Sequence, residues 1–157
     1  MQKSTRGIAM PNKRFKPLID KTFYIIWIPT ILLLVAATVI SFSAPVALVI
    51  LLLSDVFTLY FLFSSLAGYV ELREDSVYIK FGFILKAEIP YERIRGFSKE
   101  HKIYSDSTFS IKNSLDHVNI KYDKFELASV SVVNNDELIS EIEARIKAKI
   151  HQNNPNL

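Results

Sequence analysis

The run Ser114-Leu115-Asp116-His117 brings the three residue types of a hydrolytic triad within four positions. In such a triad a histidine accepts the proton of the serine hydroxyl, and a carboxylate orients the imidazole. The sequence "DHVNIKY" alternates, which predicts a strand, and adjacent strand residues point to opposite faces of a sheet. Asp116 and His117 are therefore expected to point apart. We expect Ser114 and Asp116 to shape the loop before this strand instead of catalysing a reaction.

The remaining composition offers no other reaction centre. The chain has no cysteine, so a disulfide, a thiolate nucleophile or a cysteine-bound metal is excluded. Its histidines, His101, His117 and His151, are too far apart to bring two imidazoles onto one face of a helix or strand. With four glycines in all, the chain has no glycine-rich phosphate loop. We expect no enzyme, no metal and no cofactor.

The positive charge lies at the start of the chain. Residues 1–22 contain six Lys or Arg and one acidic residue, whereas residues 69–157 contain 13 basic and 14 acidic residues. A nucleic-acid-binding domain needs a basic stripe on its folded surface. We therefore expect no nucleic acid as a partner.

Two long apolar runs follow the basic segment. Residues 23–40 and 46–63 are each 18 residues long, and Asp55 is the only charged residue in either of them. A helix of about 20 apolar residues crosses a bilayer. The sequence therefore predicts a transmembrane helical hairpin over 23–66, with helices at about 23–41 and 45–65. A signal peptide is a poorer explanation, because its apolar core is only about 7–15 residues long and is not followed by a second run.

The basic cluster predicts the orientation of this hairpin. Loops rich in Lys and Arg stay on the cytoplasmic side of a membrane. The tail 1–22 is therefore expected in the cytoplasm, and two crossings return the rest of the chain to the same side. The residues of the cluster are Lys3, Arg6, Lys13, Arg14, Lys16 and Lys21.

Asp55 is the one ionisable side chain inside a predicted span. An aspartate at the centre of a membrane helix costs about 2.5–3.5 kcal/mol on insertion, which the surrounding Leu, Ile, Val and Phe residues offset. If the hairpin turns near Phe42, Thr30 lies at a similar depth and is expected to contact Asp55. The alternative is a functional contact with a partner helix or a membrane-active peptide, since ionisable groups within membranes often serve function.

The back half reads as a small β domain over 69–150. Alternating or apolar runs predict strands at "YVEL", "VYIKF", "LKAEIP", "RIRGFSK", "DHVNIKY" and "FELASVSV". Residues 100–114 are polar, and their apolar residues have no regular spacing, which predicts a loop. A polar tail, 151–157, ends the chain.

A C-terminal helix is predicted over 135–150. Asn134 can cap it, with Glu137 three residues further on. An apolar residue recurs every fourth position, which predicts a stripe that covers the open face of the sheet. The stripe consists of Leu138, Ile142, Ile146 and Ile150. Glu141 and Arg145 are expected to pair on the solvent side.

The hairpin "KFGFILK" is the best candidate for a contact surface. Four apolar residues crowd a turn between Lys80 and Lys86, namely Phe81, Phe83, Ile84 and Leu85. An apolar tip flanked by cations can insert into the bilayer surface and contact anionic lipid. The alternative is that two or three of these apolar side chains pack inward.

A second group of cations follows the hairpin in sequence. Arg93, Arg95, Lys99 and Lys102 either form a basic rim beside the tip or a solvated face. Such a rim would contact the membrane or a partner.

The sequences "SLDHVNIKYDK" and "VSVVNNDELI" resemble the bacterial PH-like domain family of short membrane-anchored proteins. The residues that match in the first are Ser114, Leu115, Asp116, Val118, Ile120 and Tyr122, and those in the second are Val130, Ser131, Asp136, Glu137, Leu138 and Ile139. The resemblance covers roughly residues 44–150. The chain departs from the family pattern at Val132, where proline is usual, and at Leu138, where phenylalanine is common.

The resemblance implies an α+β membrane protein, in which a transmembrane helical hairpin precedes a PH-like β domain that is closed by a C-terminal helix. It implies no activity, although the family includes an immunity protein against a sublancin-type bacteriocin. Two hypotheses follow. The chain is a non-enzymatic binding module at the cytoplasmic face of a bacterial plasma membrane, or it protects against a membrane-active bacteriocin. The expected partners are the lipid bilayer and an unknown membrane or cytoplasmic protein or peptide.

Overall fold

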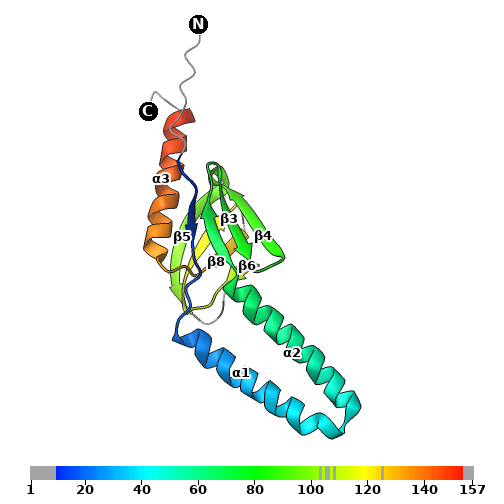
Figure 1. Cartoon of the computed structure of the whole chain (residues 1–157). Coiled ribbons are helices and arrows are strands. Elements are labelled where there is room, and N and C mark those ends of the chain that lie inside the picture. Colours follow the sequence, from blue (N-terminus) through cyan, green and yellow to red (C-terminus); the bar gives the residue numbers. More distant parts are fainter. Residues whose placement is uncertain (1–9, 103, 105–106, 108, 125, 154–157) are drawn as a thin grey trace.

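A helical hairpin extends from one end of a β domain, and a long C-terminal helix lies along the side of that domain (Figure 1). The computed structural model describes residues 10–102, 104, 107, 109–124 and 126–153. Lys3 and Arg6 of the expected basic cluster lie outside the described residues. So do part of the expected loop 100–114 and the end of the polar tail 151–157.

The hairpin consists of α1 (Lys21–Ile40), the short 3-10 helix η1 (Ser41–Ser43) and α2 (Pro45–Leu66). Pro45 occupies the first turn of α2, where its missing N–H has no helical partner to lose. Both helices are long and apolar enough to cross a membrane, and their apolar stretches are not buried inside the protein. The two long apolar helices predicted from the sequence are thus present.

In the described part of the chain, eight strands form two four-stranded sheets. The first sheet contains β1 (Lys13–Phe15), β2 (Tyr69–Leu72), β3 (Ser76–Phe81) and β4 (Leu85–Pro90), in that order and all antiparallel. The second sheet has the order β5-β7-β8-β6, in which β6 and β8 are parallel. Its strands are β5 (Ile94–His101), β6 (Phe109–Ile111), β7 (Asp116–Tyr122) and β8 (Glu126–Val130).

Two of these strands differ from the sequence-based expectation. Residues 13–15 were assigned to the basic tail, but they form β1, which pairs with β2 and buries Phe15. The expected loop 100–114 contains the end of β5 and all of β6. Strands of three residues are too short to show an alternating pattern, and both new strands pair with segments far away in sequence.

The helix α3 (Asn135–Asn153) closes the domain. Asn134 Oδ1 accepts the Glu137 N–H at 3.1 Å, and Asn134 Nδ2 donates to Glu137 Oε2 at 3.0 Å, so the expected cap is present. Leu138 and Ile142 are fully buried in the core, but Ile150 is 53% exposed. The stripe therefore covers the sheets only over its first part.

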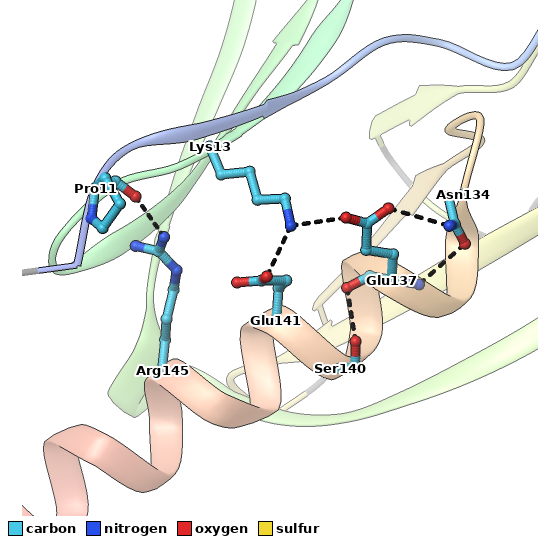
Figure 2. Close-up of polar contacts among 7 residues, drawn as sticks. All are labelled: Pro11, Lys13, Asn134, Glu137, Ser140, Glu141 and Arg145. Atoms are coloured by element: carbon cyan, nitrogen blue, oxygen red, sulfur yellow. Dashed lines mark hydrogen bonds and ion pairs between the residues drawn. The ribbon is translucent and has the colours of Figure 1, made fainter.

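Strand β1 and the residues just before it are bound to α3 by ion pairs and a hydrogen bond (Figure 2). Lys13 Nζ lies 2.7 Å from both Glu137 Oε1 and Glu141 Oε1. Arg145 is buried and donates a hydrogen bond of 2.6 Å to the Pro11 carbonyl. The expected Glu141–Arg145 pair was wrong, because Lys13 of β1 pairs with Glu141, whereas Arg145 donates to the carbonyls of Pro11 and Arg73.

Strand β1 also constrains both ends of the hairpin. It precedes α1, whereas β2 follows α2, and the two strands pair residue by residue from Lys13↔Leu72 to Phe15↔Val70. The outer ends of α1 and α2 therefore belong to one folded domain and lie on the same side of any membrane that the hairpin crosses.

Two consecutive residues bind the two helix ends to the domain. Ser114 Oγ donates to Asp20 Oδ2 at 2.6 Å, while Asp20 Oδ1 caps α1 by accepting the Thr22 N–H at 2.9 Å. Asn113 Nδ2 donates to the Ser65 carbonyl at the end of α2 at 2.9 Å. Both Asn113 and Ser114 are buried. We call this pair of contacts the Asn113–Ser114 joint.

A further contact to α2 depends on a glycine. Gly82, in the β3–β4 turn, has a φ of +82°, and a Cβ at this position would lie 1.7 Å from Ser64 Oγ and 2.8 Å from the Ser64 carbonyl oxygen. The Phe83 N–H donates to Ser64 Oγ at 3.3 Å. The β3–β4 turn can therefore approach α2 this closely only with glycine at position 82.

Replacing Gly82 by alanine should separate the turn from α2. A left-handed conformation costs a non-glycine residue about 1–2 kcal/mol, to which the contact with Ser64 adds. We expect Gly82→Ala to lower the thermal unfolding temperature of the full chain in detergent. Gly96→Ala is the matched control, because nothing lies within 4 Å of a Cβ built there. Equal unfolding temperatures for the two variants would contradict the close packing at Gly82.

Asp20→Asn tests the charge at the joint. Asparagine can still cap α1, but it offers Ser114 no second carboxylate oxygen. Burial alone would raise the pKa of Asp20, but hydrogen bonds from Ser114, Phe23 and Thr22 outweigh it and lower the pKa below the ordinary 3.8. Because the folded-state pKa is lowered, the charge stabilises the fold above about pH 4, and this effect is lost as the pH falls further.

We therefore expect Asp20→Asn to cost about 1 kcal/mol of unfolding free energy at neutral pH. The difference from the unchanged chain should shrink below about pH 4, as measured by thermal unfolding in detergent over a pH series. Glu74→Gln is the control, since it also replaces a carboxylate by an amide and Glu74 is exposed. If the loss of unfolding free energy in Asp20→Asn stays constant with pH, the carboxylate charge does not stabilise the joint.

Candidate membrane-facing site

The tip of the β3–β4 hairpin exposes three consecutive apolar side chains. Phe83, Ile84 and Leu85 are 51%, 73% and 57% exposed, whereas Phe81 is buried in the core. Packing into the core, which the sequence left open for the whole run, thus applies to Phe81. Exposed neighbouring apolar residues of this size indicate a contact surface.

This tip lies beside the last turns of α2. Besides the hydrogen bond from Phe83 to Ser64, the rings of Phe83 and Tyr60 pack with their centroids 6.0 Å apart. The tip and the end of the second apolar helix therefore form one continuous surface. Sequence reasoning missed Ser64 and Tyr60 as parts of this site, because nothing local to either segment indicates that they meet.

Cations lie on the strands behind the tip. Lys80 and Lys86 are directly opposite each other in the β3–β4 pair, although like charges in that position repel. Lys80 Nζ also lies 5.8 Å from the centroid of the Tyr69 ring, and the Arg14 guanidinium stacks over the same ring at 4.0 Å. The structure thus adds Arg14 to the two lysines that the sequence indicated.

The expected basic rim is divided between other surfaces. Arg93 Nε donates to Asp123 Oδ1 at 2.7 Å, and its Nη2 donates to Asp123 Oδ2. This guanidinium lowers the pKa of Asp123 and holds it in a left-handed conformation, with a φ of 48°, in the β7–β8 turn. Arg93 therefore stabilises that turn, whereas Arg95 is exposed and lies beside α3.

Arg95 lines a groove of about 440 Å³ between β5 and α3. Figure 1 shows these two elements on one side of the domain and β4 on the other. The apolar residues that line the groove are Ile94, Phe97, Ile139 and Ile146, and the charged ones are Arg95, Lys99 and Glu143. The groove and the tip are therefore separate surfaces with different neighbours.

Asp55 has a different partner from the one expected. Thr38 Oγ1 donates to Asp55 Oδ2 at 2.9 Å, whereas Thr30 Oγ1 donates to the Ile26 carbonyl of its own helix at 2.7 Å. The expected Asp55–Thr30 contact was wrong, because the two hydroxyls are used differently: Thr30 bonds within its own helix and Thr38 bonds Asp55. Thr38, near the end of α1, meets Asp55 instead.

The residues of the apparent triad do not assemble. Asp116 is exposed and lies 2.6 Å from His101 Nδ1, whereas His117 is buried, with its Nδ1 2.9 Å from the Leu115 carbonyl. Their opposite orientation confirms the strand argument. Ser114 donates to Asp20, and its Oγ accepts the Asp116 N–H at 3.0 Å, as expected for a residue that shapes the loop. Among the described residues, no group of three His, Asp or Glu is arranged to hold a metal ion.

Comparison with known families gives one result that bears on the whole β domain. The family model of the bacterial PH domain matches residues 68–146, which is half of the chain. Neither the curated proteins nor the solved structures give a match. The matched segment begins where α2 ends and reaches into α3, so it covers every strand except β1. The chain therefore belongs to the bacterial PH domain family.

Proposed function

We propose that this protein is a non-enzymatic binding module at the cytoplasmic face of a bacterial plasma membrane. The α1–α2 hairpin anchors it, and the PH domain presents a surface to a partner. The observation that carries this proposal is the exposed tip of Phe83, Ile84 and Leu85 beside the end of α2. A tip in that position is at the depth where a membrane-spanning α2 would leave the bilayer.

The chemistry of the tip suits the interface of a membrane. Its apolar side chains gain free energy when they leave water for the region between headgroups and acyl chains. Lys80 and Lys86 lie behind the tip, where they attract the anionic headgroups of the inner leaflet. Arg14, nearby, already pairs with Glu71. Insertion of the tip would fix the PH domain against the bilayer surface.

Charge supports a cytoplasmic position. Lys13, Arg14, Lys16 and Lys21 immediately precede or begin α1. Positively charged residues close to a span favour the cytoplasmic side. Because β1 and β2 pair, the PH domain lies on the same side as these residues.

The groove between β5 and α3 is the best candidate for the partner surface. Arg95 makes no ion pair within the described part of the chain, and the groove combines this cation with apolar residues such as Phe97 and Ile139. We infer that its partner is a protein segment with acidic and apolar side chains. The tip would hold this groove at a fixed height above the membrane.

Protection against a membrane-active bacteriocin is the second candidate, and it rests on Asp55. A polar pair inside an otherwise apolar hairpin, Asp55 with Thr38, is the feature that favours it. The same hydrogen bond gives the carboxylate a partner within the hairpin, which favours a structural role. The binding module is therefore the better supported of the two.

The position of the tip can be measured with a fluorescent label, because the chain has no cysteine of its own. We expect Ile84→Cys, labelled with an environment-sensitive dye and reconstituted in vesicles, to emit at short wavelength. Lipids that carry a quencher near the headgroup should reduce this emission. Lys147→Cys, on an exposed position of α3, is the control and should behave as in water. Water-like emission from both positions would refute the membrane-facing tip.

Site-specific photo-crosslinking in native membranes separates the two candidate functions. A photoreactive residue at Ile84 should give lipid adducts, one at Arg95 should give a protein adduct, and one at Asp55 should give only adducts within the hairpin. The protein adduct should disappear when Lys99, also in the groove, is changed to Glu, because an acidic segment would be repelled. A peptide adduct at Asp55, without one at Arg95, would support the protection hypothesis instead.

A further inference from the structure

A recess of about 280 Å³ lies where the end of α2 meets the β3–β4 turn and the segment that follows β6. Tyr60 and Phe61 of α2 and Leu85 of the tip form apolar parts of its lining. Ser64 and Lys112 contribute polar groups. The recess is separate from the groove beside Arg95, and it lies at the junction of the apolar hairpin and the PH domain.

The apolar part of the lining continues onto the surface of the hairpin. Phe61 is 59% exposed and Leu85 is 57% exposed, so both reach from the recess to the outside of the protein. If α2 crosses the membrane, this outer surface contacts acyl chains. An occupant that extends from the recess along α2 would therefore need an apolar portion of its own.

The polar part of the lining is cationic. Lys112 is half-buried, and its Nζ donates to the Tyr104 carbonyl at 2.9 Å, which is a neutral acceptor. Within the described residues no carboxylate pairs with Lys112, and none of the lining residues is acidic. Burial lowers the pKa of Lys112. A cation that is partly withdrawn from water is stabilised by an anion beside it.

The Ser64 hydroxyl offers a second donor. Its oxygen accepts the Phe83 N–H, so its own hydrogen remains available to an oxyanion. An ammonium and a hydroxyl that belong to the lining of one recess suit the oxygens of a phosphodiester. Lys80 and Lys86, on the same hairpin, raise the local concentration of anions.

We propose that this recess binds one anionic phospholipid of the surrounding leaflet, with its phosphate at Lys112 and Ser64 and its acyl chains along Tyr60 and Phe61. The proposal deepens the proposed function, because it requires the PH domain to lie against the membrane. It adds to that function that the lipid recognised by the module has an anionic headgroup. A free phosphate would satisfy Lys112 but leave the apolar lining uncovered.

The test measures lipid retention by the full chain. The protein is reconstituted in nanodiscs of equimolar phosphatidylglycerol and phosphatidylcholine, transferred to detergent, and examined by native mass spectrometry. We expect the unchanged chain to retain phosphatidylglycerol in preference to phosphatidylcholine, because the two share the phosphodiester but Lys112, Lys80 and Lys86 would repel the choline cation. Lys112→Gln should reduce the retained phosphatidylglycerol by about tenfold, since it removes a charged hydrogen bond. Lys112→Arg should keep most of it.

Lys147→Gln is the matched control, because it removes one exposed lysine from α3 and should leave retention unchanged. Equal retention of the two lipids by the unchanged chain, or undiminished phosphatidylglycerol on Lys112→Gln, would overturn the proposal. If Lys112→Gln does not fold, Ser110→Trp decides, because a large ring at this exposed lining position should displace the lipid. Full retention by Ser110→Trp would likewise overturn it.

The dye at Ile84, measured in the same nanodiscs, distinguishes the two possible failures. Membrane-like emission together with unselective lipid retention would reject the phospholipid site and keep the membrane-facing tip. Water-like emission would reject the proposed function itself. Free inorganic phosphate, added as a competitor, should not displace the retained phosphatidylglycerol; displacement would show that the recess recognises phosphate alone.

Discussion

The hydrogen bonds of Asn113 and Ser114 are the contacts on which the arrangement of the whole chain depends. Ser114 bonds the Asp20 carboxylate that caps α1, and Asn113 bonds a carbonyl at the end of α2. Both residues are buried, so their polar groups would be left without partners if the helices moved away. The segment that looked most like a reaction centre in the sequence therefore has a mechanical role, because it couples a pair of apolar helices to a PH domain.

Strand β1 makes this coupling rigid. A domain attached only through the end of α2 could rotate about that single connection. Here the chain enters the domain before α1 and again after α2, and the salt bridges from Lys13 to Glu137 and Glu141 tie the first segment to α3. These contacts, together with the one between the β3–β4 turn and Ser64, hold the PH domain to the hairpin on several sides. The orientation of its surfaces relative to the hairpin is therefore set by the fold.

Local patterns were sufficient for the features that depend on local chemistry. The two apolar runs, the strands β2 to β4, the cap at Asn134 and the opposite directions of Asp116 and His117 all follow from residues close together in sequence. The features that were missed depend on distant partners. Phe15 is buried because it pairs with Val70 of β2, 55 residues away in sequence. Arg145 is buried because Pro11 and Arg73 offer carbonyls. Thr38 meets Asp55 through the packing of α1 against α2. Lys80 and Lys86 beside the tip could be predicted from the sequence. Ser64 and Lys112 could not, since only the packing of α2 brings them to one recess.

A PH domain that is held rigidly against its helical hairpin differs in binding from one that is joined to it by a flexible linker. Association is opposed by the loss of translational and rotational freedom, and a surface held at a fixed height and angle has lost part of that freedom before its partner arrives. If the proposed partner is itself attached to the membrane, it would meet the groove beside Arg95 at a high effective concentration, provided that its binding segment can reach the same height. Geometry thus selects among partners as much as side-chain chemistry does. The small number of charged residues in the groove is compatible with specific recognition for this reason, because Asn113, Ser114 and β1 have already determined where the groove lies.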